Sequence, residues 1–543
     1  MPTVAQLVAG YGPDFPSLAE LFALEPNDQE LLALMAPIPE LGRYFKSVVS
    51  LRNVTSDYAV GVTRFRVIAE ALLALSDTLS IYNGLHADKK VVHSLSKKDH
   101  ELLLRLARSP GDVFRAQKME KFTEHDTAAA IGYTKIKMGV TSKRLEKVME
   151  GAGFGLTSED TMGPVFGLVA NCLVFGNFIP RLLNFMERCL DYVDFCEQDG
   201  PLVLPGETHQ QAAEPTTFGK RVLTNLFPIW QALERMSSDG HFMPFSGKFG
   251  GAIGNMTNLK AAYPDIDWDI HAYKLINDRL GLSYDEMTFQ SSTYGLEAIH
   301  FSEIANILTH LVKLVEDFMN MGSCPYQGFV KLKKKGTVGS TAMPNKSNPW
   351  AQEGAVAMLL DTQSQLDFLA RSLPRFPREG NMARSYLMRT IGRRFMPAFI
   401  ALDRIDGEMI GDMRKRGYVP NLPNIQEYFD KYPGMAGSSI QTVLKREGIE
   451  GDAYRAIEKI AINPDGTYAN AAQFRSGLEE VMAEFNLPDK VRDELRLILE
   501  PSGNIGDADI LAKRWASVLR EDIAGYRQMC TVHPHSLVDD ETS

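Results

Sequence analysis

An uncharged stretch of 18 residues limits what this chain can fold into. It runs from Gly163 to Pro180 (GPVFGLVANCLVFGNFIP) and reaches the lower limit of length for a membrane-spanning helix. However, it contains two asparagines and two prolines, Arg181 follows it directly, and no second stretch of this kind occurs in the chain. These features favour a helix that is buried on all sides inside a bundle, and we expect no contact with a membrane.

Long amphipathic segments make up much of the remaining chain. Apolar residues recur every three or four positions from Ser302 to Phe318, which is typical of a helix, and the segment 64–76 also predicts a strong helix. Similar runs cover about 166–198, 220–236, 353–372 and 393–411. Runs of 16 residues or more predict helices of about 25 Å or longer. Because no convincing series of alternating strands accompanies them, the sequence predicts an all-α fold with a central helical bundle.

The charge balance and the cysteines exclude several classes of protein. Lysine and arginine number 58 and aspartate and glutamate 68, so the net charge is −10. A chain this acidic has no overall attraction to DNA, RNA or an anionic membrane, although a local basic pocket for a small anion is compatible with it. Five cysteines without a C-x-x-C pair indicate reduced thiols and a cytoplasmic protein. No zinc-binding, Walker or dinucleotide motif occurs, so we expect no metal ion and no cofactor.

Two polar segments between the predicted helices are suited to acid–base chemistry. His209 lies in a Thr-His-Gln-Gln segment before a helical run, where proton transfer and a capping or packing role are both open. The segment from Gly339 to Pro349 contains Ser340, Lys346 and Asn348. A serine becomes a competent base only where a cation or aligned N–H groups stabilise its alkoxide. The alternative for this segment is a solvated basic loop that caps the next helix.

The segment 339–349, GSTAMPNKSNP, resembles the GSSxMPxKxNP loop of the fumarase/aspartase superfamily. Further segments resemble one family within it, the adenylosuccinate lyases: TSED (157–160), EHDTAAA (124–130), THQQAAEPTTFGK (208–220), GKFGGAIGNMTNLKAAYPDIDW (247–268) and IQTVLKREGIEGDAYRAIEKI (440–460). The resemblance extends over about residues 42–510. It implies a three-domain helical fold whose central bundle forms the core of a homotetramer, with active sites shared between subunits. The expected domains are residues 1–145, 146–408 and 409–543, with an N-terminal extension and a C-terminal tail at the two ends.

The same resemblance implies a β-elimination that needs no cofactor and acts on a small nucleotide. Adenylosuccinate would give AMP and fumarate, and the succinyl-carboxamide ribotide of purine synthesis would lose fumarate in the same way. Ser340 would remove the Cβ proton and His209 would protonate the departing nitrogen. The substrate-binding positions carried over from the family are Arg43, Tyr44, His125, Asp126, Thr157, Ser158, Thr208, Gln211, Gln290, Lys346, Asn348, Arg378, Ser385 and Arg389.

Several positions depart from the family pattern close to the expected substrate. Glu207 stands where the family usually has arginine, and Gln210 replaces a glycine. The segment after Gln290 reads Ser-Ser-Thr-Tyr-Gly, and the span between Arg378 and Arg389 is about two residues longer than usual. These departures keep two alternatives open. One is a related lyase that acts on a different succinyl adduct, and the other is a catalytically inactive structural paralogue.

Overall fold

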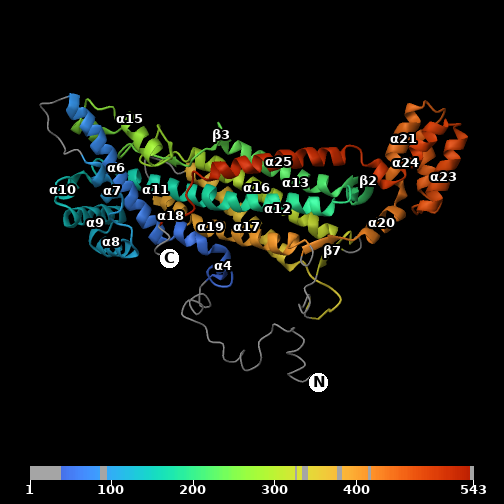
Figure 1. Ribbon diagram of the computed structural model, residues 1–543, viewed down its shortest axis with the longest axis horizontal. Coiled ribbons are helices and arrows are strands. Elements are labelled where there is room, and N and C mark those ends of the chain that lie inside the picture. Colours follow the sequence, from blue (N-terminus) through green and yellow to red (C-terminus); the bar gives the residue numbers. More distant parts are fainter. Residues whose placement is uncertain are drawn as a thin grey trace, which may run out of the picture.

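The computed structural model describes residues 38–85, 95–323, 327–332, 340, 342–375, 382–413 and 417–538. Within these ranges the chain is built mainly of helices, and the strands form short two-stranded pairs, so the predicted all-α fold is confirmed. Figure 1 shows an elongated molecule in which groups of small helices lie at the two ends of a long bundle. Most of the predicted N-terminal extension lies outside the described residues.

The N-terminal helices pack around one long helix. Ser96 and Ser109 each begin a helix with a capping box, in which the side chain accepts the backbone N–H three residues on. The helices are α4 (Phe45–Val48), α5 (Arg52–Thr55), α6 (Asp57–Leu85), α7 (Lys97–Leu104), α8 (Pro110–Thr123), α9 (Asp126–Thr141) and α10 (Lys143–Glu146). Buried apolar residues of α6, α8 and α9 form a core that is separate from the central one.

The central bundle contains the long helices that the sequence predicts. They are α11 (Ser158–Leu173), the π-helical turn η4 (Val174–Phe178), α12 (Ile179–Cys196), α13 (Phe218–Arg235), α16 (Gly295–Met321), α17 (Trp350–Ser372), α19 (Ile391–Ile405) and η7 (Asp406–Ile410). On α16 the buried residues recur at helical spacing and face α13 and α17, as with Ile304, Leu308 and Leu311. Burying each such side chain contributes roughly 1.5–3 kcal/mol.

The uncharged stretch is an inner helix of this bundle. The continuous helix Ser158–Cys196 is long and apolar enough to cross a membrane, with a mean hydropathy of 1.6 in its 18-residue window. In the protein, 89% of that window is buried. The expectation of a helix buried inside a bundle is therefore confirmed.

Short strands and helices connect the long helices, and the sequence analysis did not find the strands. The longest pair is an antiparallel hairpin, β1 (Val203–Thr208) and β2 (Gln211–Thr217). The other connecting elements are β3 (Ser237–Ser238), β4 (His241–Phe242), β5 (Ser246–Gly247), α14 (Thr257–Ala262), α15 (Trp268–Tyr273), β6 (Ser283–Tyr284), β7 (Phe329–Leu332), α18 (Met382–Arg389) and β8 (Gly417–Pro420). A hairpin therefore leads directly into α13, at a place where the sequence predicted a loop.

The last helices form a small core and then return to the bundle. A third apolar cluster joins α21 (Gly437–Arg446), α22 (Ala453–Ala461), α23 (Ala471–Glu484) and α24 (Asp489–Ile498), which follow α20 (Leu422–Lys431). The final helix, α25 (Ala508–Cys530), lies along α12 and α13 and shares their core (Figure 1). Trp230 Nε1 donates to Asp522 at 2.7 Å, and Arg527 pairs with Glu187 at 2.6 Å. The domain limits at 145 and 408 stay predictions.

The residues after α25 dock on the π-helical turn. Pro180 has no N–H to continue the regular helical ladder. Asn177, in the π-helical turn, joins the turn to the later segment, because its Nδ2 donates to the carbonyls of Cys172 (2.7 Å) and His535 (3.1 Å). A Cβ on Gly176 would come within 2.1 Å of the Pro534 carbonyl oxygen, so glycine is required for this close approach. Residues 534 and 535 are thereby held against the π-helical turn.

Candidate active site

The TSED segment forms the start of α11. Thr157 is the N-cap, and its N–H and Oγ1 donate to Asp160 Oδ2 at 2.8 and 2.9 Å. Ser158 opens the first turn. The N-terminal end of a helix offers unpaired N–H groups and a partial positive charge. Thr157 and Ser158 therefore lie at a place suited to a carboxylate.

A buried ion pair fixes this helix end to the glycine-rich segment that follows Ser246. Lys248 Nζ lies 2.7 Å from Asp160 Oδ1, and the two side chains are 0% and 1% exposed. The same carboxylate oxygen accepts the N–H groups of Gly250 (2.8 Å) and Gly251 (3.2 Å). Lys248 also donates to the Gly251 carbonyl at 2.9 Å. The charges are paired and hydrogen-bonded, as a buried pair requires.

Three further predicted residues meet close to this helix end. Asp126 accepts hydrogen bonds from Arg389, on α18, and from Arg64, on α6, the latter at 2.9 Å. Arg389 Nε also donates to Ser385 Oγ at 3.1 Å, and Ser385 is buried. Burial alone raises the pKa of Asp126, but the guanidinium groups of Arg64 and Arg389 outweigh it and lower that pKa below its usual value. Asp126 is therefore ionised, and its carboxylate holds the guanidinium groups of Arg64 and Arg389 together.

Two more predicted residues lie beside this group. His125 is exposed and is the N-cap of α9, where its Nδ1 accepts the Ala128 N–H at 3.4 Å. Its Nδ1 is 3.6 Å from Asp126 Oδ1. Gln290 is half-buried and directly precedes Ser291, whose hydroxyl accepts a hydrogen bond from Arg384 on α18. One region thus contains His125, Asp126, Thr157, Ser158, Gln290, Ser385 and Arg389, and we call it the helix-end group.

His209 lies elsewhere, at the exposed tip of the β1–β2 hairpin. Thr208 pairs with Gln211, and the two residues between them have left-handed φ angles of 53° (His209) and 61° (Gln210). Positive φ at both positions defines a two-residue type I′ turn, which matches the twist of the strands. The Tyr428 hydroxyl donates to Glu207 at 2.6 Å, so α20 holds the strand that leads to His209. The three predicted residues Thr208, His209 and Gln211 all face solvent.

A third set lies between β7 and α17 and beside α4. Ser340 Oγ accepts the Met343 N–H at 3.2 Å, Lys346 is exposed, and Asn348 is half-buried. The Arg404 guanidinium lies between two rings, 4.7 Å from Tyr44 and 5.7 Å from Trp350 at the start of α17. Tyr44 is therefore near the start of α17. Arg43 is exposed beside Tyr44. Arg378 lies outside the described residues.

The helix-end group and His209 cannot meet within one chain. Thr157 begins the continuous 39-residue helix Ser158–Cys196, and the hairpin follows the other end of that helix. At 1.5 Å per residue the helix is about 58 Å long. Figure 1 shows the same separation, with β2 near α20 at one end of the bundle and α9 and α18 toward the other.

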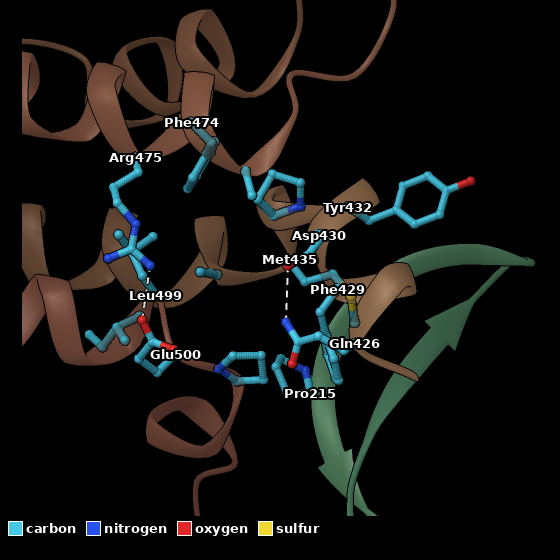
Figure 2. A pocket seen from close by; sticks show the side chains of 15 residues that line it. Pro215, Gln426, Phe429, Asp430, Tyr432, Met435, Phe474, Arg475, Leu499 and Glu500 are labelled. Carbon is cyan, nitrogen blue, oxygen red and sulfur yellow. Dashed lines mark hydrogen bonds and ion pairs between the residues drawn. The ribbon is translucent and has the colours of Figure 1, made fainter. Parts of the chain in front are cut away.

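The hairpin also borders a cavity of about 100 Å³ that opens between β2 and the C-terminal helices (Figure 2). Phe429, Met435 and Phe474 form much of its apolar wall. An ion pair of 2.9 Å between Arg475 and Glu500 lies at its side. None of the predicted site residues lines this cavity, so it is distinct from the helix-end group and from the hairpin tip.

Comparison with known proteins defines the class. The model of a lyase family matches residues 72–360, which is more than half of the chain. Two solved structures share the fold: a fumarate lyase from Mesorhizobium sp. BNC1 (TM-score 0.61, 15% identity, 87% of this chain and 97% of the other) and the β-carboxy-cis,cis-muconate cycloisomerase from Acinetobacter calcoaceticus sp. ADP1 (TM-score 0.56, 14% identity, 88% and 98%). The chain is therefore a lyase with the fold of the fumarase/aspartase superfamily, and it belongs to the matched lyase family.

Within that class the similarity is to one kind of enzyme. An adenylosuccinate lyase from Dictyostelium discoideum is 28% identical over 482 residues, which cover 86% of this chain and 96% of the relative. The adenylosuccinate lyase from Escherichia coli K12 is 26% identical over 489 residues, or 88% and 98% of the two chains. The resemblance to adenylosuccinate lyases that the sequence motifs indicate is confirmed across most of the chain.

Three charged residues beside the helix-end group were not found by the sequence analysis. Arg64 lies in a segment that was predicted only as a helix, and Lys248 lies in a family motif in which no role was assigned to it. Arg384 directly precedes Ser385 but carried no signal of its own. Their partners Asp126, Asp160 and Ser291 are remote in sequence, so no local pattern could have found them.

Proposed function

We propose that the protein is a cytoplasmic adenylosuccinate lyase of purine biosynthesis. It releases fumarate from adenylosuccinate to give AMP, and from the succinyl-carboxamide ribotide of the same pathway. The observation that carries this proposal is the similarity to adenylosuccinate lyases over 86–88% of the chain, together with a histidine and a serine at the acid and base positions of the family motifs. The substrate is a small nucleotide, and no cofactor takes part.

Two protein groups carry the proton transfers of the elimination, one that removes a proton and one that donates a proton. Ser340 Oγ takes the proton from Cβ of the succinyl group, and the electron pair of that bond forms the double bond of fumarate. The C–N bond breaks, and His209 donates a proton to the departing nitrogen of AMP. Charge builds up on the carboxylate next to the carbanion, and Lys346 and Asn348 stabilise it there. Thr157 and Ser158 bind the other fumarate carboxylate at the start of α11.

We further propose a homotetramer whose active sites combine residues from several subunits. The helix between Thr157 and the hairpin supports this, because it is about 58 Å long and, within one chain, His209 follows the end opposite to the helix-end group. The exposed tip that carries His209 is free to enter the helix-end group of a neighbouring subunit. A folded monomer is then inactive, and activity appears with assembly.

A spectrophotometric assay with adenylosuccinate, which follows purine absorbance and fumarate release together, tests the proposal. We expect both signals to change in step for the purified full-length protein. His209→Ala and Ser340→Ala should each lower kcat by about 10²–10⁴-fold, the usual contribution of a general acid or base, while the oligomer stays folded. Near-normal kcat in both variants would contradict the assigned roles.

A folded oligomer with no turnover of adenylosuccinate would favour the alternative of a different succinyl adduct. Glu207 and the residues 291–295 are where the chain departs from the family, so their substitution is the next experiment in that case. Lack of turnover on any fumarate adduct would favour an inactive structural paralogue.

A further inference from the structure

Arg384 is a buried arginine on the short helix α18, which also carries Ser385 and Arg389. Only 4% of the residue is exposed to solvent. The guanidinium donates through Nη1 to the Ser291 hydroxyl and to the Ser292 carbonyl oxygen, the latter at 3.3 Å. Its Cζ lies 5.5 Å from the centre of the Tyr294 ring. All three contacts are to the segment that directly follows Gln290.

That segment is a firm support for the arginine. Ser292 Oγ donates to Asp285 at 2.6 Å and lies 2.9 Å from Ser246 Oγ, which in turn donates to Glu297 at 2.6 Å. Tyr294 is 3% exposed and has a left-handed φ of 58°, which an aromatic residue adopts only where its surroundings fix it. The backbone after Gln290 is therefore held from several sides.

The helix that carries Arg384, α18, also packs against α11. Glu159, next to Ser158, is close enough for its carboxylate to interact with the charge of Arg384. Burial raises the pKa of Glu159, while Lys248, Arg384 and Arg389 act in the opposite direction. The arginine thus lies between the start of α11, the segment after Gln290, and the rest of α18.

We propose that Arg384 is a positioning residue, which fixes α18 so that Ser385 and Arg389 face Thr157, Ser158 and Gln290. A guanidinium suits this task because one arm of its planar fork donates to two acceptors while its central carbon lies over an aromatic ring. The proposal deepens the proposed function, since it concerns how the substrate-binding side chains of the helix-end group are held. Arg384 itself does not touch the substrate.

The first test does not depend on the substrate. Hydrogen–deuterium exchange of the full-length oligomer is compared for wild type, Ser291→Ala, Arg384→Lys and Arg384→Met. Loss of the contacts should speed exchange in α18 about tenfold or more while α19, the next helix, stays unchanged. Ser291→Ala removes a single acceptor and keeps the buried charge, so it remains informative if Arg384→Met fails to fold. Unchanged exchange of α18 in both Ser291→Ala and Arg384→Lys would overturn the proposal.

The second test separates positioning from general stability. In the adenylosuccinate assay, Ser291→Ala should raise KM about fivefold and Arg384→Met about twentyfold or more, with kcat within threefold of wild type. Arg384→Lys should fall between, because it restores the charge but not the fork. The exposed Arg393→Gln on α19 is the control and should change neither constant. A fall in kcat at constant KM would refute positioning of the binding residues.

Failure of the proposed function is distinguishable from failure of this inference. If wild type does not turn over adenylosuccinate, the function is wrong, and the exchange of α18 still decides the role of Arg384. If wild type is active but the variants leave both KM and α18 exchange unchanged, only the role of Arg384 is wrong.

Discussion

Replacing Lys248 with methionine is the sharpest test of how the start of α11 is held. Methionine keeps an unbranched side chain of similar length but has no ammonium group. The Asp160 carboxylate, 1% exposed, would keep only the N–H groups of Gly250 and Gly251 as partners to its Oδ1. We therefore expect Lys248→Met to leave a buried charge without its counter-charge, and to destabilise the protein.

The size of the effect follows from the burial of the pair. Removing one partner of a buried ion pair typically costs about 3–5 kcal/mol. Unfolding entropy is about 2.1 cal/mol/K per residue, which for roughly 500 cooperating residues amounts to about 1 kcal/mol/K. The melting temperature should therefore fall by about 3–5 °C. The double variant Lys248→Met/Asp160→Asn removes both charges and should recover at least half of that loss.

Differential scanning calorimetry at one fixed protein concentration measures these shifts, since oligomer melting depends on concentration. The control is Lys135→Met, which breaks a 2.7 Å pair with the largely exposed Glu150 and should shift the melting temperature by less than about 1 °C. A Lys248→Met protein that melts within 1 °C of wild type, or a double variant no more stable than the single one, would show that the pair does not hold this helix end.

Three further outcomes are expected. Gln210→Gly should raise the stability of the hairpin by about 1 kcal/mol, because glycine adopts the left-handed φ of 61° without strain, and calorimetry should show a small rise in melting temperature. Burial holds the pKa of His271 and of His300 near 4, whereas unfolded histidine titrates near 6.5, so stability should be full above about pH 6.5 and fall toward pH 4 by about 1.4 kcal/mol per pH unit for each. His300→Phe should flatten that fall in a series of melts between pH 7 and pH 4.5, and an unchanged slope would contradict the assignment. Tyr428→Phe should speed hydrogen exchange at the hairpin tip, because Glu207 loses a 2.6 Å hydrogen bond, and equal exchange would show that α20 does not hold the tip.

Helical periodicity predicted the fold well because it is a local property of the chain. The sequence predicts helices around Arg64 and Ile304, and both segments lie in long helices of the structure. The hairpin at His209 was missed because its turn has neither glycine nor asparagine at the two left-handed positions, so the usual signal of a type I′ turn is absent.

For the candidate site too, the sequence predicted what depends on neighbouring residues and missed what depends on contacts between distant segments. Motifs located Thr157 and Ser385 because contiguous residues carry the family pattern. The contacts of Arg384 with Ser291 were out of reach, since 93 positions separate the two residues along the chain. The motifs place His209 and the helix-end group in one site, and the structure shows that within one chain they lie toward opposite ends of the long helix Ser158–Cys196.

The docking of the chain end on the π-helical turn has a consequence for protein synthesis. Asn177 and His535 are 358 positions apart, and the ribosome adds about 5–20 residues per second. About 20–70 s therefore pass between the emergence of the turn and the arrival of the segment that covers it. During that time the ring of Phe175 lacks one of its neighbours, because in the finished protein the His533 ring lies 5.0 Å from it. Nascent chains halted before α25 should bind chaperones more tightly than the released protein, and a nonsense codon near the 3′ end of the message should be as harmful as one in the middle.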